Sequence, residues 1–446
     1  MTDLSWNQPL NQMDNSTYQR ILALLRQEVK PALGCTEPIA LAIAVARACA
    51  EFPGIVPEKV SVAVSANILK NGMGVGIPGT GMVGLPIAAA LAVTCGRHEY
   101  GLEVLKDLER ESVAAAKAFV DAGKVSITLA HDCPLLYIDA ACIYPGGDSS
   151  RAVVQDSHDH IALVERNGEV LLDDRVKPAG AEDGGVEETV TAGDGLTLEL
   201  MYEFARTADL ADLEIIRQGA DMNKALAKEG VTHNYGLRVG KTIESNVNNN
   251  IFGYSLITRC MTMTAAASDA RMAGCTLPAM SNSGSGNQGI TASMPVVAAA
   301  EHLMSSHEDM IRALTLSNLV AIHIKSYLGK LSALCGCVIA STGSACGIVM
   351  LYGGSFKQIC YAVKNMIGDI TGMVCDGAKE GCAMKVASGV SSAVQSAVLA
   401  LSDICVSRND GIIDDDVEKT ISNLGKIGSK GMRTTDEMIL DIMVCK

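Results

Sequence analysis

The sequence is poor in aromatic residues and in positive charge. Phe, Tyr and Trp make up 4% of the 446 residues, so a core must be built from Ala, Val, Ile, Leu and Met. Lys and Arg number 36 against 50 Asp and Glu, which gives a formal net charge of −14. Nucleic acids and anionic membranes are bound through clustered Lys and Arg. The composition therefore argues against both as partners.

Patterns for export and for membrane insertion are also missing. Residues 1–19 are polar, carry Asp3 and Asp14, and contain neither the basic start nor the apolar run of a signal peptide. The longest uncharged stretch, 331–356, is repeatedly interrupted by Gly and Ser, so we expect a buried helix pair there rather than a membrane span. We expect a cytoplasmic protein.

Cysteine, in contrast, is abundant. There are 15 Cys, and without an export signal they indicate a reducing compartment, in which disulfides are rare. Most of them are expected to serve as small core hydrophobes. The question is which few carry chemistry.

Hydrophobic periodicity divides the chain into two parts. Before residue 198, helical and strand patterns alternate. Helices are expected over 16–29, 39–49, 86–93 and 103–121, and strands over 60–68, 125–129, 136–143, 151–155, 160–166 and 170–172. Beyond it, helices are expected over 198–209, 211–228, 241–272, 290–304, 307–328, 356–370 and 383–405. We predict an α+β fold: an N-terminal α/β domain with a mixed sheet over 1–197, ending in an acidic, Gly-rich linker over 173–197, and a nearly all-α domain over 198–446.

Cys35 lies in the turn Gly34-Cys35-Thr36-Glu37-Pro38, which leads into an apolar helix. Backbone amides and the positive end of the helix dipole would stabilise a thiolate at such a position. A stabilised thiolate can act as a nucleophile or as a general base. Position alone favours a structural cysteine equally.

Two Gly-rich loops are candidate ligand sites. Residues 71–81 contain five glycines but match neither a phosphate-binding loop nor a dinucleotide fingerprint, and alone they favour a structural loop. Residues 281–289, with the sequence Ser-Asn-Ser-Gly-Ser-Gly-Asn-Gln-Gly, precede a helix and could cradle a carboxylate or phosphate. Because such a polar loop is costly to bury unless something binds it, ligand binding is favoured there.

A group of cysteines follows in the helical part. Cys335-Gly336-Cys337 is one element, and Cys375 and Cys382 enclose a loop with two glycines. This spacing matches no common zinc knuckle, and thiolates without paired histidines favour an iron–sulfur cluster over zinc. Three ligands would leave one iron open as a Lewis acid. Buried structural cysteines explain the spacing equally well.

Taken in this order, four segments resemble the signatures of the L-cysteine desulfidase family, also described as serine dehydratase alpha-chain-like or UPF0597-type proteins. They are Gly34–Pro38, residues 71–81, residues 281–289 and Cys375–Cys382. The resemblance spans about residues 20–440. The chain is similar, more distantly, to iron–sulfur L-serine dehydratases, which carry serines and a histidine where this chain has Gly34–Pro38.

The resemblance implies an oxygen-labile [4Fe-4S] cluster and no pyridoxal phosphate. Its ligands would be Cys335, Cys375 and Cys382, with Cys337 as an alternative to Cys335. Cys35 would be the catalytic residue, acting as base. The substrate would be held near the Cys35 turn and by the two Gly-rich loops, at Thr36, Glu37, Asn71, Gly72, Ser283, Gly284, Ser285, Gly286 and Asn287.

The implied reaction is β-elimination of L-cysteine to pyruvate, ammonia and sulfide. L-serine deamination, a non-catalytic iron–sulfur or zinc redox sensor, and a binding protein with structural cysteines are the alternatives. The expected partner is a small amino acid, and Ala- and Gly-rich helix faces suggest a homo-oligomer. The sequence leaves open the preferred substrate, the pathway and the resting ligand of the fourth iron, for which Cys445 is a candidate.

Overall fold

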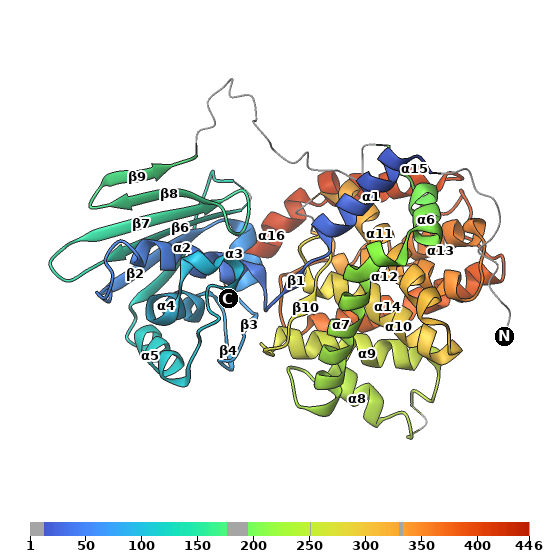
Figure 1. The fold of residues 1–446 in the computed structure, drawn as a ribbon, viewed down its shortest axis with the longest axis horizontal. Coiled ribbons are helices and arrows are strands. Elements are labelled where there is room, and N and C mark those ends of the chain that lie inside the picture. Colours follow the sequence, from blue (N-terminus) through green and yellow to red (C-terminus); the bar gives the residue numbers. More distant parts are fainter. Residues whose placement is uncertain (1–12, 135, 176–194, 250, 330–332, 446) are drawn as a thin grey trace.

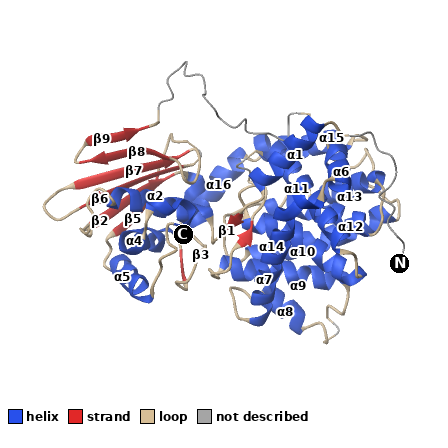
Figure 2. Ribbon diagram, viewed as in Figure 1, coloured by secondary structure: helices blue, strands red, loops and turns tan. Residues whose placement is uncertain are grey.

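The chain folds into a sheet-bearing half and a helical half that lie side by side (Figure 1). This computed structural model describes residues 13–134, 136–175, 195–249, 251–329 and 333–445. The strands of the large sheet all lie in the first half, and the second is built almost entirely of helices (Figure 2). The predicted α+β class is confirmed.

Six strands form the large sheet. In spatial order they are β5 (Val125–Leu129), β2 (Lys59–Val64), β6 (Tyr137–Ile143), β7 (Ser149–Gln155), β8 (Ile161–Arg166) and β9 (Glu169–Asp173). β2 is parallel to β5 and the other neighbours are antiparallel, so the sheet is mixed, as predicted. The turn between β8 and β9 is made by Asn167 and Gly168, both with positive φ, as a tight hairpin requires.

Three helices cover one face of this sheet: α2 (Thr36–Cys49), α4 (Leu85–Cys95) and α5 (Arg110–Asp121). Their apolar side chains share one core with the inward residues of β2, which include Val60 and Val62. The strand expected over 60–68 ends at Val64, because Ser65 begins the short helix α3 (Ala66–Gly72), which buries Ile68 and Leu69. The helix expected over 103–121 begins only at Arg110, after a 3₁₀ turn, His98–Glu103.

The helical half packs around α12 (Gly336–Leu351), a helix buried from Cys337 to Leu351. Small residues allow this packing, since a Cβ at Gly343 would lie 2.2 Å from the Ser317 carbonyl oxygen of a neighbouring helix. The other helices are α6 (Leu198–Thr207), α7 (Glu214–Thr232), α8 (Val239–Ser245), α9 (Leu256–Met272), α10 (Gly286–Leu303), α11 (His307–Leu328), α13 (Phe356–Asp369), α14 (Cys382–Leu401) and α15 (Val417–Lys426).

Two helical predictions in this half were wrong. The pair of helices expected over 331–356 is the single helix α12. The helix expected over 241–272 is divided into α8 and α9. Asn246 ends α8 by donating its side-chain amide to the Thr242 carbonyl oxygen at 2.9 Å, and Ser255 caps the start of α9.

Both ends of the described chain cross between the halves. The N-terminal helix α1 (Asn15–Glu28) packs Ile21 and Leu25 into the core of the helical half. The C-terminal helix α16 (Arg433–Val444) lies between the halves (Figure 1) and places Leu440 in the core of the sheet half. The boundary at residue 197 stays a prediction, and residues 176–194 of the expected linker lie outside the described residues.

Two short ladders complete the connection near the Gly-rich loops. β1 (Pro31–Ala32) pairs with β10 (Ala279–Met280), and β3 (Gly76–Ile77) pairs with β4 (Met82–Val83).

Within the described residues, α14 alone is long and apolar enough to cross a membrane. Because 56% of its apolar window is buried inside the protein, it has the features of a core helix.

Candidate active site at the junction of the two halves

Cys35 lies at the junction, at the N-cap position of α2. Its side chain is 4% exposed and makes no capping hydrogen bond. It forms a small buried cluster with Val75 and Met272, against which Ala378 and Cys382 pack. The thiol predicted to be catalytic and one predicted cluster ligand, from opposite halves of the molecule, therefore share one apolar cluster.

The loop 71–81 covers the Cys35 turn. Gly34 has a φ of +73°, and a Cβ there would lie 2.8 Å from Cγ of Pro78, so both conformation and space require glycine. Gly74 forms a parallel bridge with Lys379 of the Cys375–Cys382 loop. This glycine-rich loop therefore joins the Cys35 turn to the Cys375–Cys382 loop.

The Cys375 and Cys335 segments lie side by side. The amide of Cys335 donates to the Met373 carbonyl oxygen at 2.7 Å, and the amide of Cys375 donates to the Ala333 carbonyl oxygen at 2.7 Å. The hydrogen bond with Cys335, followed by burial, raises the pKa of Cys375 well above its ordinary value. Burial raises the pKa of Cys382, and the charge of nearby Cys375 adds to that rise.

Cys337 differs from Cys335 in its surroundings. It is 3% exposed and packs among apolar side chains of α8, α9 and α14, which include Ile243 and Val386. The thiol of Cys335 contacts both Cys337 and Cys375. This arrangement favours Cys335 over Cys337 as the partner of Cys375.

Lysines surround the cysteine group. Lys70, Lys325 and Lys385 all lie close enough to influence the titration of Cys335 or Cys375. Burial lowers the pKa of Lys325, while the two cysteines act in the opposite direction. Lys70 pairs with Asp436 of α16, and Lys379 and Lys385 pair with Asp376. Positive charge thus gathers where thiolates would carry negative charge.

The donor set fits an iron–sulfur cluster better than a single ion. Among the described residues, no group of three or more His, Cys, Asp or Glu side chains is arranged to hold one metal ion. Iron–sulfur clusters are held by Cys thiolates, and thiolates on different irons stand around a cluster rather than around one point. Three cysteines flanked by lysines satisfy the chemistry of such an anionic group.

Arg271 is the site residue that sequence reasoning missed. It lies near the end of α9, is 7% exposed, and donates from Nη2 to the Gly34 carbonyl oxygen at 3.1 Å and from Nη1 to Oδ1 of Asn287 at 3.3 Å. Burial raises the pKa of the Cys35 thiol to about 11, and the charge of Arg271 opposes that rise. The available signal was an arginine that directly follows a run of small and apolar residues, broken only by Asp269, in the expected helix.

The loop 281–289 is partly helical, since α10 begins at Gly286. Ser283 donates its backbone amide to the Glu28 carbonyl oxygen at 2.9 Å, and Ser285 caps α10 by accepting from the Gln288 amide. Gly284 is exposed. Only the helical part of the loop, at Gly286 and Asn287, therefore contacts Arg271.

The remaining predicted binding residues have mixed surroundings. Thr36 and Glu37 form the half-buried first turn of α2, and the charge of Glu37 contributes to the raised pKa of Cys35. Asn71 donates to Asn67 on the same helix at 3.1 Å. A Cβ at Gly72 would lie 2.3 Å from a methyl carbon of Leu85, so packing alone explains that glycine.

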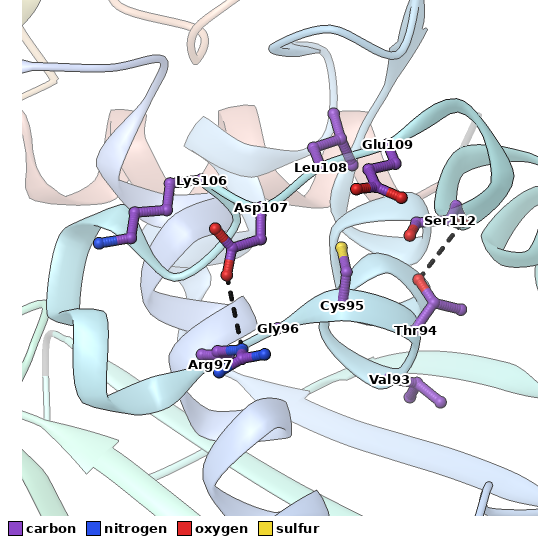
Figure 3. A pocket seen from close by; sticks show the side chains of 10 residues that line it. All are labelled: Val93, Thr94, Cys95, Gly96, Arg97, Lys106, Asp107, Leu108, Glu109 and Ser112. Carbon is purple, nitrogen blue, oxygen red and sulfur yellow. Dashed lines mark hydrogen bonds and ion pairs between the residues drawn. The ribbon is translucent and has the colours of Figure 1, made fainter.

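Other candidate features lie apart from this group. A pocket of about 680 Å³ between the end of α4 and the start of α5 includes Arg97, Lys106 and Asp107 in its lining (Figure 3), but none of the predicted site residues. His160 contacts Asp174 at 3.0 Å in a hairpin. Cys445 is exposed at the end of α16.

The sequence profile of the family described as "Serine dehydratase alpha chain" matches residues 99–441. The chain therefore belongs to this family, which indicates a lyase-type enzyme. Its curated relatives include UPF0597 proteins of Parabacteroides distasonis, 50% identical over 97% of this chain and 100% of the relative, and of Bacteroides fragilis, 49% identical over the same shares. A third, from Oleidesulfovibrio alaskensis, is 48% identical over 96% of this chain and 98% of its own. The resemblance inferred from the motifs is confirmed at the level of the family.

Proposed function

We propose that this protein is an iron–sulfur-dependent L-cysteine desulfidase that works without pyridoxal phosphate and converts L-cysteine and water to pyruvate, ammonia and hydrogen sulfide. The observation that carries the proposal is that Cys382 packs against the small buried cluster that contains Cys35, close enough to influence the titration of the Cys35 thiol. A reactive thiol from the sheet half meets a cysteine of the proposed cluster group from the helical half. Membership of the serine dehydratase alpha-chain family supports an elimination from a small amino acid.

In this proposal, Cys335, Cys375 and Cys382 hold a [4Fe-4S] cluster. Such a cluster supplies a Lewis-acidic iron with an open position. The nearby lysines stabilise the negative charge that three thiolates bring to a buried place. Lys325, which has no ion-pair partner among the described residues, is the lysine whose charge most needs such an anion.

The proposed role of Cys35 is removal of the α-proton. Its thiolate takes the proton from the α-carbon, the Cβ–S bond breaks, and the electron pair of that bond leaves with the sulfide. The released aminoacrylate tautomerises to an imine, and water converts it to pyruvate and ammonia. A thiolate in a buried site is a stronger base than one in water, which suits a weakly acidic proton.

The proposal prefers L-cysteine to L-serine because Cys35 stands where the iron–sulfur L-serine dehydratases carry serines and a histidine. Val75, Met272 and Ala378 make the surroundings of the thiol largely apolar, and Arg271 is the donor beside it. The second candidate, an L-serine dehydratase, is supported by the family name, and relative kcat/KM values for the two amino acids distinguish them.

The test begins with anaerobic reconstitution using iron and sulfide. We expect visible absorbance, iron binding, and sulfide and pyruvate formed in equal amounts from L-cysteine. Cys35→Ser should keep the iron and the absorbance but lose about 10²- to 10⁴-fold in kcat, the usual contribution of a general base. Cys346→Ala, in the core of the helical half, is the matched control and should retain activity.

Two results would contradict the proposal in different ways. A Cys35→Ser protein with its cluster and full activity would remove Cys35 from the mechanism. A wild-type protein that binds iron and sulfide but converts no small amino acid would instead favour a redox sensor.

A further inference from the structure

Arg271 is a buried guanidinium with no carboxylate partner among the described residues. It is 7% exposed and donates to the Gly34 carbonyl oxygen, Oδ1 of Asn287 and Sδ of Met272, all of them neutral. Its Nε is buried and has no hydrogen-bond partner among the described residues. The neighbouring Cys35 thiol, whose pKa burial raises to about 11, balances the charge of Arg271 only when it is ionised.

A second buried arginine in the same half shows the usual arrangement. Arg312 is 8% exposed, donates to the Ala205 and Ala208 carbonyl oxygens, and pairs with the carboxylate of Glu308 at 2.8 Å. Burying a charge is costly unless an opposite charge accompanies it. Since Arg312 has a carboxylate partner and Arg271 has none among the described residues, a carboxylate from outside the chain is expected at Arg271.

The N-terminus of α10 adds a second positive potential at the same place. This helix has 18 residues and starts at Gly286, where a Cβ would lie 2.1 Å from Nε of Arg271. The amides of Gly286 and Asn287 have no acceptor within the helix, and the helix dipole is positive at this end. A buried arginine and a helix N-terminus therefore meet without a negative charge between them.

We propose that Arg271 and the first turn of α10 bind the α-carboxylate of the amino-acid substrate. The hydrogen bond from Arg271 to the Gly34 carbonyl oxygen fixes the guanidinium next to the Cys35 turn, so a carboxylate held there places the α-carbon near the thiol. The ligand class is a small amino acid with a free carboxylate and a short side chain, since Val75 and Met272 close the cluster. That the ligand is L-cysteine rests on the proposed function, whereas carboxylate binding does not.

The experiment compares two thiols on anaerobically purified protein. 3-Mercaptopropionate carries a thiol and a carboxylate, and cysteamine carries a thiol and an amine but no carboxylate. Binding is measured by calorimetry and by the shift in melting temperature, so the readout does not depend on turnover. We expect the wild type to bind 3-mercaptopropionate and to discriminate against cysteamine.

Arg271→Gln should weaken 3-mercaptopropionate binding by about 10- to 100-fold, the value of one charge-assisted hydrogen-bonding group. Arg271→Lys should recover part of the affinity, and Arg312→Lys should bind as the wild type does. For L-cysteine, Arg271→Gln should raise KM by about 10-fold or more and change kcat less. Circular dichroism checks that each variant is folded.

Undiminished 3-mercaptopropionate binding by Arg271→Gln or equal wild-type affinity for both thiols would overturn the assignment of Arg271. Selective, Arg271-dependent binding without turnover of any amino acid would instead support the carboxylate site and refute the desulfidase proposal.

Discussion

The junction and the interior of the helical half are both buried, but their charged side chains differ in whether they have a carboxylate partner. In the interior, the buried guanidinium of Arg312 pairs with Glu308, and the imidazole of His323, 0% exposed, contacts Glu418 at 2.7 Å. At the junction, Arg271 and Lys325 have no carboxylate partner among the described residues. Charge balance in the interior comes from the chain itself.

Cysteines show the same difference. Cys260 and Cys346 of the interior are surrounded by apolar side chains and act as small hydrophobes. The cysteines of the junction contact one another, and lysines lie near them. The proposals above therefore place the groups from outside the chain at the junction, whereas the cysteines of the interior only add to the packed core.

Removing one thiol from each region should give the largest contrast. Cys375→Ala should abolish iron binding and visible absorbance after anaerobic reconstitution, since it removes a proposed ligand. Cys346→Ala should retain both and lose only about 1 kcal/mol of stability. Iron analysis and denaturant unfolding measure the two effects. Full iron content in Cys375→Ala would show that the cysteines of the junction and of the interior do not differ in iron binding.

Substitutions at two glycines within the Cys375–Cys382 loop test whether the conformation of this loop matters for iron binding. Gly377 has a φ of +90°, and a Cβ there would lie 2.1 Å from the Lys70 carbonyl oxygen, so Gly377→Ala should cost about 2 kcal/mol or more and reduce iron binding. Gly381 has a φ of −60°, and a Cβ there would meet only the Lys379 side chain at 3.6 Å or more, so Gly381→Ala is the control and should be near neutral. Similar behaviour of the two variants would show that the loop's conformation is not required.

The last expected effect concerns pH and changes stability without touching the proposed ligands. Burial raises the pKa of Asp269, beside the junction, to about 7, although backbone amides near Gly240 oppose the rise. The folded protein therefore holds a proton that the unfolded chain releases above its ordinary pKa of 3.8. This contribution to stability is complete below that value and is lost as pH rises to about 7, by up to about 1.4 kcal/mol per pH unit.

Asp269→Asn should remove that slope, and the exposed Asp221→Asn should keep it. Unfolding midpoints at pH 5, 6, 7 and 8 test this, with wild type and each variant measured side by side (about one-unit steps suffice for such a slope). Parallel curves for wild type and Asp269→Asn would contradict the assignment.

Local patterns were enough to predict most of the fold. The alternation of apolar and polar residues predicted the strands β2 and β5 to β9, and the Asn167-Gly168 pair predicted the last hairpin of the sheet. Both predictions succeeded because strand period and turn geometry depend on neighbouring residues. The α8–α9 break was missed because Asn246 and its neighbours satisfy backbone groups that periodicity does not register. The packing of α1 into the distant helical half was missed for another reason. Amphipathic spacing shows that a helix has a buried face, but it does not show against which core that face packs.

The sequence by itself determined the elements, the family, and the cysteine and glycine motifs from which a cluster and a catalytic thiol were proposed. Only the tertiary structure decided that Cys382 packs against the buried cluster that contains Cys35, that the Ser283 amide bonds to the Glu28 carbonyl oxygen, and that Arg271 lies buried beside Gly34. The physical reason is that motifs are short-range patterns along the chain. Contacts, burial and charge balance depend on which distant segments the packed cores bring together.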